Sequence, residues 1–309
     1  MPDLPPDVVR TPDARFDGLP EWPFRPQYLW ADLPGFDRPL RLHLVDEGPR
    51  NAPETVLMLH GEPSWGYLYR RMIPPLVAAG HRAVAFDFPG FGRSDKPTRT
   101  SPYTYELFRA ALLEVIRQLD LRNVTLVVQD WGGLMGLPAA ALDVPDRIAR
   151  LVVMNTFLPT GRERPTFGFK VWKASVRVLG RHLPIGVLMR IALPTRQAPF
   201  VRGYTAPFPS ARHKAGAATW PLLVPSDPSD PVAEVMVRAR AALATWNKPC
   251  LLVWSESDPI LGGAWKTFER LVPTAAPPTF VRGGHFLQDA SGAEIADHVV
   301  AFMGAASSV

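Results

Sequence analysis

Short runs of consecutive apolar residues alternate along this chain with segments whose apolar positions recur at helical spacing. A continuous apolar run predicts a strand buried on both faces, which is typical of parallel sheets covered by helices. Five runs have this form: 55–60, 82–87, 124–129, 151–154 and 250–254. Residues 38–48 alternate instead and predict an early antiparallel strand, while Phe280 and Val281 are expected to lie in the last strand.

Three further segments predict helices. The clearest runs from Tyr105 to Leu119, where apolar residues recur every three or four positions and give the helix one buried face. Residues 264–271 and 294–302 show the same pattern over shorter lengths. Strands and helices that alternate in this way predict an α/β fold with a mostly parallel central sheet flanked by helices.

The alternation stops at Phe157 and resumes near Ala233. Between them lie no strand-like runs, only basic amphipathic pieces such as FGFKVWKASVRVLG and PIGVLMRIALPTR. An excursion of this length in an α/β chain predicts an inserted helical cap over the edge of the sheet that holds the active site. We therefore expect a core formed by residues 1–156 and 233–309, with a helical cap at 157–232.

The overall composition is that of a globular protein, but its charge is unevenly distributed. Of the 309 residues 47% are hydrophobic and 20% are charged, and the formal net charge is +5. Residues 157–232 contain eleven Lys/Arg against three Asp/Glu, a local balance of +8 that leaves −3 for the remainder. We interpret the basic segment as a solvated lid. The alternative is that its field draws an anionic or polar substrate toward a cleft.

Several classes of partner lack a signal in this sequence. The opening residues MPDLPPDVVR have neither the basic start nor the apolar run of a signal peptide, and no stretch reaches the roughly 18 apolar residues of a membrane span. The basic residues form no recognisable nucleic-acid-binding motif. Cys250 is the only cysteine, so we expect it buried at a strand end and unable to form an intrachain disulfide. These features predict a cytoplasmic protein with no metal, nucleic-acid or membrane partner.

The segment VTLVVQDWGG, residues 124–133, combines a buried strand, a tight turn and the start of a helix. This arrangement is the nucleophile elbow of α/β-hydrolases, in which small residues after the apex let the helix pack closely on the strand. The apex here is Asp130, where the commoner motif has Ser, and Val128 replaces the usual small residue two positions earlier. Taken alone, Asp130 could equally be a helix N-cap.

The order of the remaining residues favours catalysis. A triad on this fold needs a nucleophile, then an acid, then a histidine, all at one edge of the sheet. Asp258 follows the strand at 250–254, and His285 follows the last strand through a Gly-Gly turn. The other histidines have simpler interpretations: His43 on a strand surface, His298 on a helix surface, and His182 and His213 in the basic lid.

An earlier loop, Leu59-His-Gly-Glu-Pro63, lies where the fold supplies an oxyanion hole. We assign that hole to the backbone N–H groups of Glu62 and Trp131. His60 is interpreted as a structural residue of this loop, and Asp87 as a loop anchor. Pro138, seven residues after Trp131, should break or kink the helix behind the elbow near Leu134.

Together, the motifs HGEPSWGYLYRRM, DFPGFGRSDKP, VVQDWGG, SESDPI and GGHFLQD resemble those of haloalkane dehalogenases, in particular subfamily I. The resemblance runs from about Phe16 to the last helix and is weakest across the cap. It implies that Asp130 attacks carbon, that His285 activates water and that Asp258 orients and charge-balances the histidine. It implies no cofactor and a small haloalkane as substrate.

The resemblance also implies two indole N–H groups that hold the departing halide. Trp131 matches the first, next to Asp130, and Trp172 aligns with the second, in the cap. Trp220 is the fallback ligand and better resembles an aromatic residue of the pocket wall. The same alignment implies a small apolar pocket lined by Phe169, Trp220, Leu134, Val224 and Leu261.

Elementary chemistry is consistent with these roles. A carboxylate can displace halide from an sp3 carbon to give an ester, and water activated by His285 can then attack the carbonyl carbon of that ester. The first step has no proton to remove, which explains an ionised aspartate in the place of serine. An indole N–H only donates hydrogen bonds and brings an apolar surface, so it suits a halide.

Other functions fit the sequence less well. An epoxide hydrolase would share the elbow, but that family generally uses two cap tyrosines as proton donors, and residues 157–232 contain only Tyr204. A fluoroacetate dehalogenase should have Arg where Trp131 stands. A receptor without turnover commonly lacks a triad member, and here all three are present. The basic cap argues against close contact between two caps and weakly favours a monomer.

Overall fold

The central feature of the structure is an eight-stranded sheet in which one strand opposes the direction of the rest. The computed structural model describes residues 4–164, 166–193, 197–255 and 257–306. Across the sheet the strands follow the order β10, β9, β8, β7, β4, β5, β3, β2. Only β3 pairs in antiparallel fashion with its neighbours, β5 and β2. Their bounds are β2 Gln27–Ala31, β3 Leu40–Glu47, β4 Thr55–Leu59, β5 Arg82–Phe86, β7 Val124–Gln129, β8 Ile148–Met154, β9 Cys250–Trp254 and β10 Thr279–Phe280.

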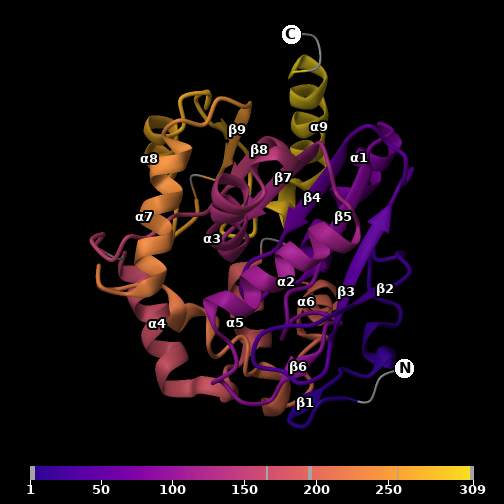
Figure 1. Cartoon of the computed structure of the whole chain (residues 1–309). Helices are drawn as coiled ribbons and strands as arrows, with labels where there is room; N and C mark the ends of the chain where they lie inside the picture. Colours follow the sequence, from indigo (N-terminus) through magenta and orange to yellow (C-terminus); the bar gives the residue numbers. More distant parts are fainter. Residues whose placement is uncertain (1–3, 165, 194–196, 256, 307–309) are drawn as a thin grey trace.

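Helices cover the sheet in two groups. Helix α1 packs with α9, whereas α2, α3 and α7 pack in a row, and Figure 1 shows α2 and α3 in front of the sheet. Helix α8 packs on β9. Their bounds are α1 Ile73–Ala78, α2 Tyr105–Gln118, α3 Trp131–Pro138, α7 Pro231–Leu243, α8 Trp265–Leu271 and α9 Leu287–Ala306.

The predicted α/β architecture is confirmed, with differences at the ends of elements. β8 begins three residues earlier than predicted, and β2, a five-residue edge strand with mostly half-buried residues, was not predicted. A short separate pair, β1 (Val8–Val9) with β6 (Lys96–Pro97), was also missed. α9 extends beyond both ends of the predicted 294–302. Ser291 has non-helical backbone angles, and the resulting kink interrupts the helical periodicity, so the first part of α9 was not predicted from the sequence.

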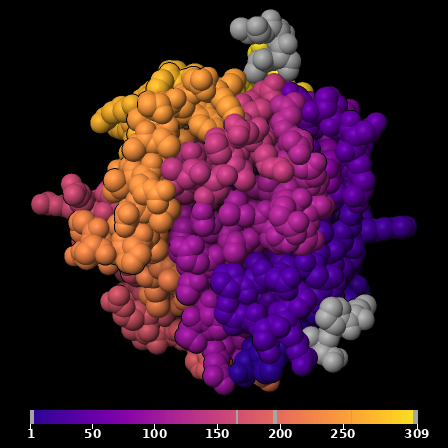
Figure 2. Space-filling view, in the orientation of Figure 1, coloured from indigo at the N-terminus to yellow at the C-terminus, as the bar shows by residue number. Residues whose placement is uncertain are grey.

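The segment between β8 and α7 consists of helices joined by turns and loops, with no strand among its described residues. It contains α4 (Phe167–Leu179), α5 (Ile185–Ala192) and α6 (Ala198–Thr205), with short 3-10 turns between and after them. In the space-filling view, which has the orientation of Figure 1, part of this segment forms the lower left of the molecule beneath α7 (Figure 2). This is the arrangement expected of a cap, although its boundaries at 157–232 stay a prediction.

Buried polar contacts join this cap to the core. Arg70, at the end of a 3-10 turn of the core, pairs with Asp289 of α9 at 2.6 Å, and both side chains are fully buried. Tyr204 of α6 lies 3.2 Å from each of them through its hydroxyl group. Nearby, the indole of Trp65 donates to the carbonyl of Gly203 at 2.9 Å. The cap tyrosine is therefore a structural tether between α6 and the core.

Pro138 was predicted to break or kink the helix near Leu134, and a break at that position is not observed. Helix α3 continues through Leu134 and ends at Pro138, after which Ala139–Asp143 form a single π-helical turn. Proline has no N–H, so the carbonyl of Leu134 lacks its usual helical donor. The hydroxyl of Tyr105, in α2, donates to that carbonyl at 3.1 Å instead. A tertiary contact thus compensates for the proline.

His43 is not a strand-surface residue, which corrects the interpretation from sequence. It is 1% exposed, and its Nδ1 lies 2.7 Å from Asp87 Oδ2. The other oxygen of Asp87 accepts from the N–H of Gly66, and Oδ2 also accepts from the N–H of Arg93. Asp87 therefore anchors three segments of the core and does not face the cavity described below.

Two further expectations from the sequence concern the single cysteine and membrane-spanning helices. Cys250 is buried at the start of β9 with no disulfide partner. No helix within the described ranges is both long and apolar enough to cross a membrane.

Candidate active site

The turn between β7 and α3 has strained backbone geometry at Asp130. This residue has φ +51° and ψ −124°, an uncommon conformation for a non-glycine residue. It is held there because its N–H donates to the carbonyl of Asn155 at 3.0 Å, while its own carbonyl accepts from the Thr156 hydroxyl at 2.6 Å. Both partners follow β8, the adjacent parallel strand. The neighbouring strand end therefore fixes the side chain of Asp130 at the apex.

Glycines after the apex allow the helix to approach the sheet. A Cβ on Gly132 would lie 2.0 Å from the carbonyl oxygen of Leu59, and one on Gly133 would lie 2.0 Å from Oγ1 of Thr156. Gly136 explains how Val128 can replace the usual small residue of the elbow. A Cβ on Gly136 would come within 2.8 Å of Cγ1 of Val128, so the helix provides the space that the strand does not.

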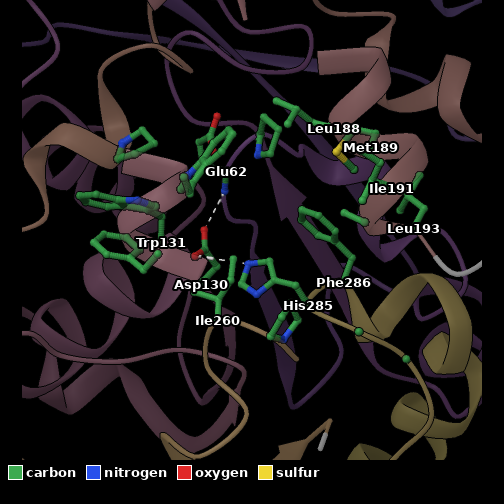
Figure 3. A pocket seen from close by; sticks show the side chains of 18 of the residues that line it. Glu62, Asp130, Trp131, Leu188, Met189, Ile191, Leu193, Ile260, His285 and Phe286 are labelled. Carbon is green, nitrogen blue, oxygen red and sulfur yellow. Dashed lines mark hydrogen bonds and ion pairs between the residues drawn. The ribbon is translucent and has the colours of Figure 1, made fainter. Parts of the chain in front are cut away.

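The two oxygens of the Asp130 carboxylate have different partners. Oδ1 accepts a 2.8 Å hydrogen bond from the backbone N–H of Glu62, and Oδ2 lies 3.5 Å from Nε2 of His285 (Figure 3). A Cβ on Gly61 would lie 2.3 Å from Oδ1, so only glycine lets the 59–63 loop come so near. One oxygen is thus bound by a backbone donor, and the other faces the histidine.

His285 and Asp258 form the second half of the constellation. Nδ1 of His285 lies 2.9 Å from Oδ2 of Asp258, whose Oδ1 accepts from the N–H groups of Ile260 and Leu261. Burial alone would raise the pKa of Asp258, but the charge of His285 and these hydrogen bonds hold it below its ordinary value. Burial likewise lowers the pKa of His285, yet the charges of Asp258 and Asp130 outweigh it and raise that pKa to about 10.

Two residues that sequence reasoning missed connect these loops. The buried side chain of Asn155 donates to the carbonyls of Gly284 and His285, at 3.1 and 3.2 Å, and accepts from the N–H of Ser255. Gln129, directly before the nucleophile, donates to the same His285 carbonyl at 3.2 Å. Asn155 directly follows an apolar strand, and that position is the signal from which its role could have been predicted.

A cavity of about 560 Å³ opens in front of Asp130 and His285. Trp131 and Trp172 line it, as do Phe169 and Val224, which agrees with their predicted positions. The wall contributed by α5 is mainly aliphatic, including Leu188, Met189, Ile191 and Leu193 (Figure 3). Among the described residues that line it there is no lysine or arginine.

Three predicted pocket residues do not line this cavity. Leu134 is fully buried within the core, where Tyr105 approaches its carbonyl. Trp220 is also fully buried and stacks on Trp131, with ring centroids 5.2 Å apart and planes inclined by 14°. It therefore supports the first tryptophan from behind. Leu261 lines a neighbouring cavity instead. Its backbone N–H donates to Oδ1 of Asp258.

The loop at 59–63 contributes two buried titratable groups. The Glu62 carboxyl group forms part of the cavity wall, and burial together with the charge of Asp130 raises its pKa well above the ordinary value. His60 accepts from the N–H of Phe88 through Nε2 at 3.1 Å, and its Nδ1 lies 2.9 Å from the carbonyl of Gly61. Such partners require the neutral imidazole, and burial lowers the pKa of His60 accordingly. His60 thus holds the loop in place.

The described ranges contain no group of three or more His, Cys, Asp or Glu residues arranged to hold a metal ion. The chemistry available here is that of an ionised carboxylate with a backbone donor on one oxygen, a histidine–aspartate pair and an apolar cavity with two indoles. That arrangement can form an ester on Asp130 and hydrolyse it.

Comparison with known proteins supports this assignment. A family model described as the alpha/beta hydrolase fold matches residues 54–290. A haloalkane dehalogenase of Psychrobacter cryohalolentis is 44% identical over 96% of this chain and 98% of its own length. Haloalkane dehalogenase 1 of Mycobacterium tuberculosis is 48% identical, with the same coverage. Among solved structures, the tetrameric haloalkane dehalogenase DpaA of Paraglaciecola agarilytica NO2 has a TM-score of 0.88 at 36% identity, covering 94% of this chain and 97% of that one.

Proposed function

Because this chain belongs to the haloalkane dehalogenases, within the α/β-hydrolase fold, we propose that it hydrolyses haloalkanes through a covalent ester on Asp130. The products are an alcohol, a halide ion and a proton. The observation that carries the proposal is the position of the Asp130 carboxylate, between the N–H of Glu62 and the imidazole of His285.

In the first step, Oδ2 of Asp130 attacks the carbon that bears the halogen, and the carbon–halogen bond breaks with its electron pair leaving on the halide. No proton moves. The indole N–H groups of Trp131 and Trp172 would donate to the departing halide, since both residues line the cavity. Oδ1, already bound to the Glu62 N–H, becomes the carbonyl oxygen of the ester.

In the second step, His285 removes a proton from water, and the resulting hydroxide attacks the carbonyl carbon of the ester. Negative charge develops on Oδ1, where the N–H of Glu62, with that of Trp131 as its expected partner, stabilises it. Asp258 holds the imidazole by its Nδ1 and stabilises the imidazolium that forms. Collapse of the intermediate releases the alcohol and regenerates the Asp130 carboxylate.

The alternative function, epoxide hydrolysis, would need a tyrosine in the cavity as proton donor, and the cap tyrosine lies outside it. Opening an epoxide requires a donor to the ring oxygen, and Tyr204, the only tyrosine of the cap segment, is fully buried beside Arg70 and Asp289. Tyr204 does not line the cavity that contains Asp130. This placement favours dehalogenation.

The substrate class is a small haloalkane, whose size is limited by a cavity of about 560 Å³. The expected monomeric state rests on the net positive charge of the cap and stays a prediction, as does the cytoplasmic location. Sedimentation analysis would test the first directly, because a tetramer like that of the Paraglaciecola relative would sediment far faster than a monomer.

Trapping the ester tests the mechanism. His285→Gln should release about one equivalent of bromide from 1,2-dibromoethane or 1-bromobutane and then stop, because water is no longer activated. Mass spectrometry of the quenched variant should show the alkyl group on a peptide that contains Asp130. Asp130→Ala should release no bromide. Steady turnover by Asp130→Ala, or styrene oxide opening without bromide release by the wild type, would contradict the proposal.

A further inference from the structure

A second cavity, of about 600 Å³, lies against the catalytic one. The two share four lining residues: Phe157, Phe169, Val224 and Ile260. Phe157 and Phe169 contact each other edge to face, with ring centroids 6.1 Å apart. An apolar partition therefore separates the cavities, and only an apolar group can be accommodated between these four side chains without loss of solvation.

The second cavity differs from the first in its charge. Its lining includes five cationic side chains: Arg164, Lys170, Lys173, Arg177 and Arg240. The carboxylate among its described lining residues, Glu163, already accepts from the N–H and hydroxyl of Thr160 and pairs with Arg240 at 2.8 Å. The catalytic cavity, in contrast, is lined by Glu62 and Asp130, and its lining within the described ranges includes no lysine or arginine.

Four of these cations have no carboxylate ion-pair partner within the part of the chain that the structure describes. Lys173 donates to the carbonyl of Val224 at 2.9 Å and is partly buried. Burial, followed by the charge of Arg177, lowers the pKa of Lys173, while Asp230 acts in the opposite direction. Lys173 and Arg177 are therefore close enough to repel one another, a cost that a bound anion would offset.

Helix α4 explains why both cavities occur together. Successive helical residues are rotated by about 100°, so Phe169 and Trp172, three positions apart, share the face toward the catalytic cavity. Lys170, Lys173 and Arg177 share an adjacent face, toward the second cavity. One helix thus contributes side chains both to an apolar, acid-containing cavity and to a cationic one.

We propose that the second cavity binds the anionic end of a substrate whose carbon–halogen bond lies at Asp130. Besides small haloalkanes, the enzyme would therefore accept a long ω-halogenated carboxylate, with its methylene chain across the Phe157–Phe169 partition. This inference rests on the function proposed above. Because the substrate has to extend from Asp130 past these shared apolar side chains to the cations, a short haloacid cannot reach both sites.

The test compares ω-bromoalkanoates of about four to about ten carbons with ω-bromoalkanols of the same length. In the wild type, the ratio of kcat/KM between acid and alcohol should be below one for short chains and rise above one for long chains. The double variant Lys170→Gln, Arg177→Gln should lower that ratio for the long acids by about tenfold, mainly through KM, and added salt should do the same. The matched control is Lys266→Gln, which removes an exposed positive charge on α8 outside the cavity and should leave the ratio unchanged.

A ratio that is independent of chain length in the wild type, or unchanged in the double variant, would overturn the proposal. A variant that alters only inhibition by free bromide would also overturn it, since the cavity would then take halide and not a carboxylate. Failure of the proposed function has a different signature, because bromide release from the bromoalkanols would then be absent as well.

Discussion

The position of His285 between two carboxylates has a consequence for the order of catalytic events. Nδ1 lies 2.9 Å from Asp258 and Nε2 lies 3.5 Å from Asp130. Although burial opposes the charged form, the two carboxylates raise the pKa of His285 from 6.5 to about 10. At 1.36 kcal/mol per pH unit, this is a preference of about 5 kcal/mol for the imidazolium. At neutral pH the free enzyme therefore holds its base in a form that cannot accept a proton.

Ester formation removes this obstacle. Alkylation converts Asp130 to a neutral ester and leaves Asp258 as the single carboxylate beside the imidazole. Two unit charges 3.5 Å apart attract by about 5 kcal/mol at an effective dielectric constant of about 20. Losing this attraction when Asp130 becomes an ester lowers the pKa of His285 toward neutrality. The imidazolium then releases its proton to solvent, and the neutral imidazole can act as the base.

The variant Asp130→Asn tests this, since the amide has the shape of the carboxylate and, like the ester, no charge. The pKa of His285, measured by NMR titration of the imidazole nitrogens, should fall by about 2 to about 3 pH units relative to the wild type. The exposed Asp227→Asn is the control and should leave it unchanged. Intact-mass measurement confirms that the amide persists. A pKa near 10 in Asp130→Asn would refute the reasoning.

The same pKa fixes the sign of two pH dependences. Because the folded pKa of His285 exceeds the unfolded one, its contribution to stability is complete below about pH 6.5 and is lost as the pH rises toward about 10. In the first turnover, the burst of bromide should not depend on the titration of His285, because alkylation of Asp130 needs no base. Ester hydrolysis should slow as the pH falls through the pKa of His285 in the alkyl-enzyme, which rapid-quench measurement of a bromide burst would detect.

Three further predictions concern single residues. Trp172→Phe removes one donor and should weaken bromide binding by about tenfold or more, measured by fluorescence quenching, with little change in Tm; unchanged affinity would exclude the residue from the halide site. Asp289→Asn removes the fully buried carboxylate partner of Arg70, leaving Arg70 with the half-exposed Glu21 at 3.3 Å. It should destabilise the fold by about 3 kcal/mol in urea unfolding, and a loss under 1 kcal/mol would contradict the tether. Gly133→Ala brings a Cβ against Thr156 and should cost about 2 kcal/mol and most bromide release, whereas wild-type activity would show that the elbow tolerates the methyl group.

Local sequence spacing determined the elements and the edge at which the chemistry lies. Apolar runs of strand length and helical periodicity gave the sheet and its covering helices, because both patterns reflect burial of one or two faces. Asp130, Asp258 and His285 could be grouped because each follows a parallel strand, and such strands end at one edge of the sheet. The glycines after Asp130 predicted the close helix approach that the contacts with Leu59 and Thr156 explain.

Tertiary structure alone decided what depends on contacts between distant segments. The direction of a buried side chain is set by its neighbours, so Trp220 supports Trp131 from behind and Leu261 faces the second cavity. The effect of Pro138 depended on a hydroxyl from another helix, 33 positions earlier in the chain at Tyr105. The catalytic cavity and the cationic one differ in their lining because α4 presents different faces to each, and that separation exists only once the cap is packed on the core.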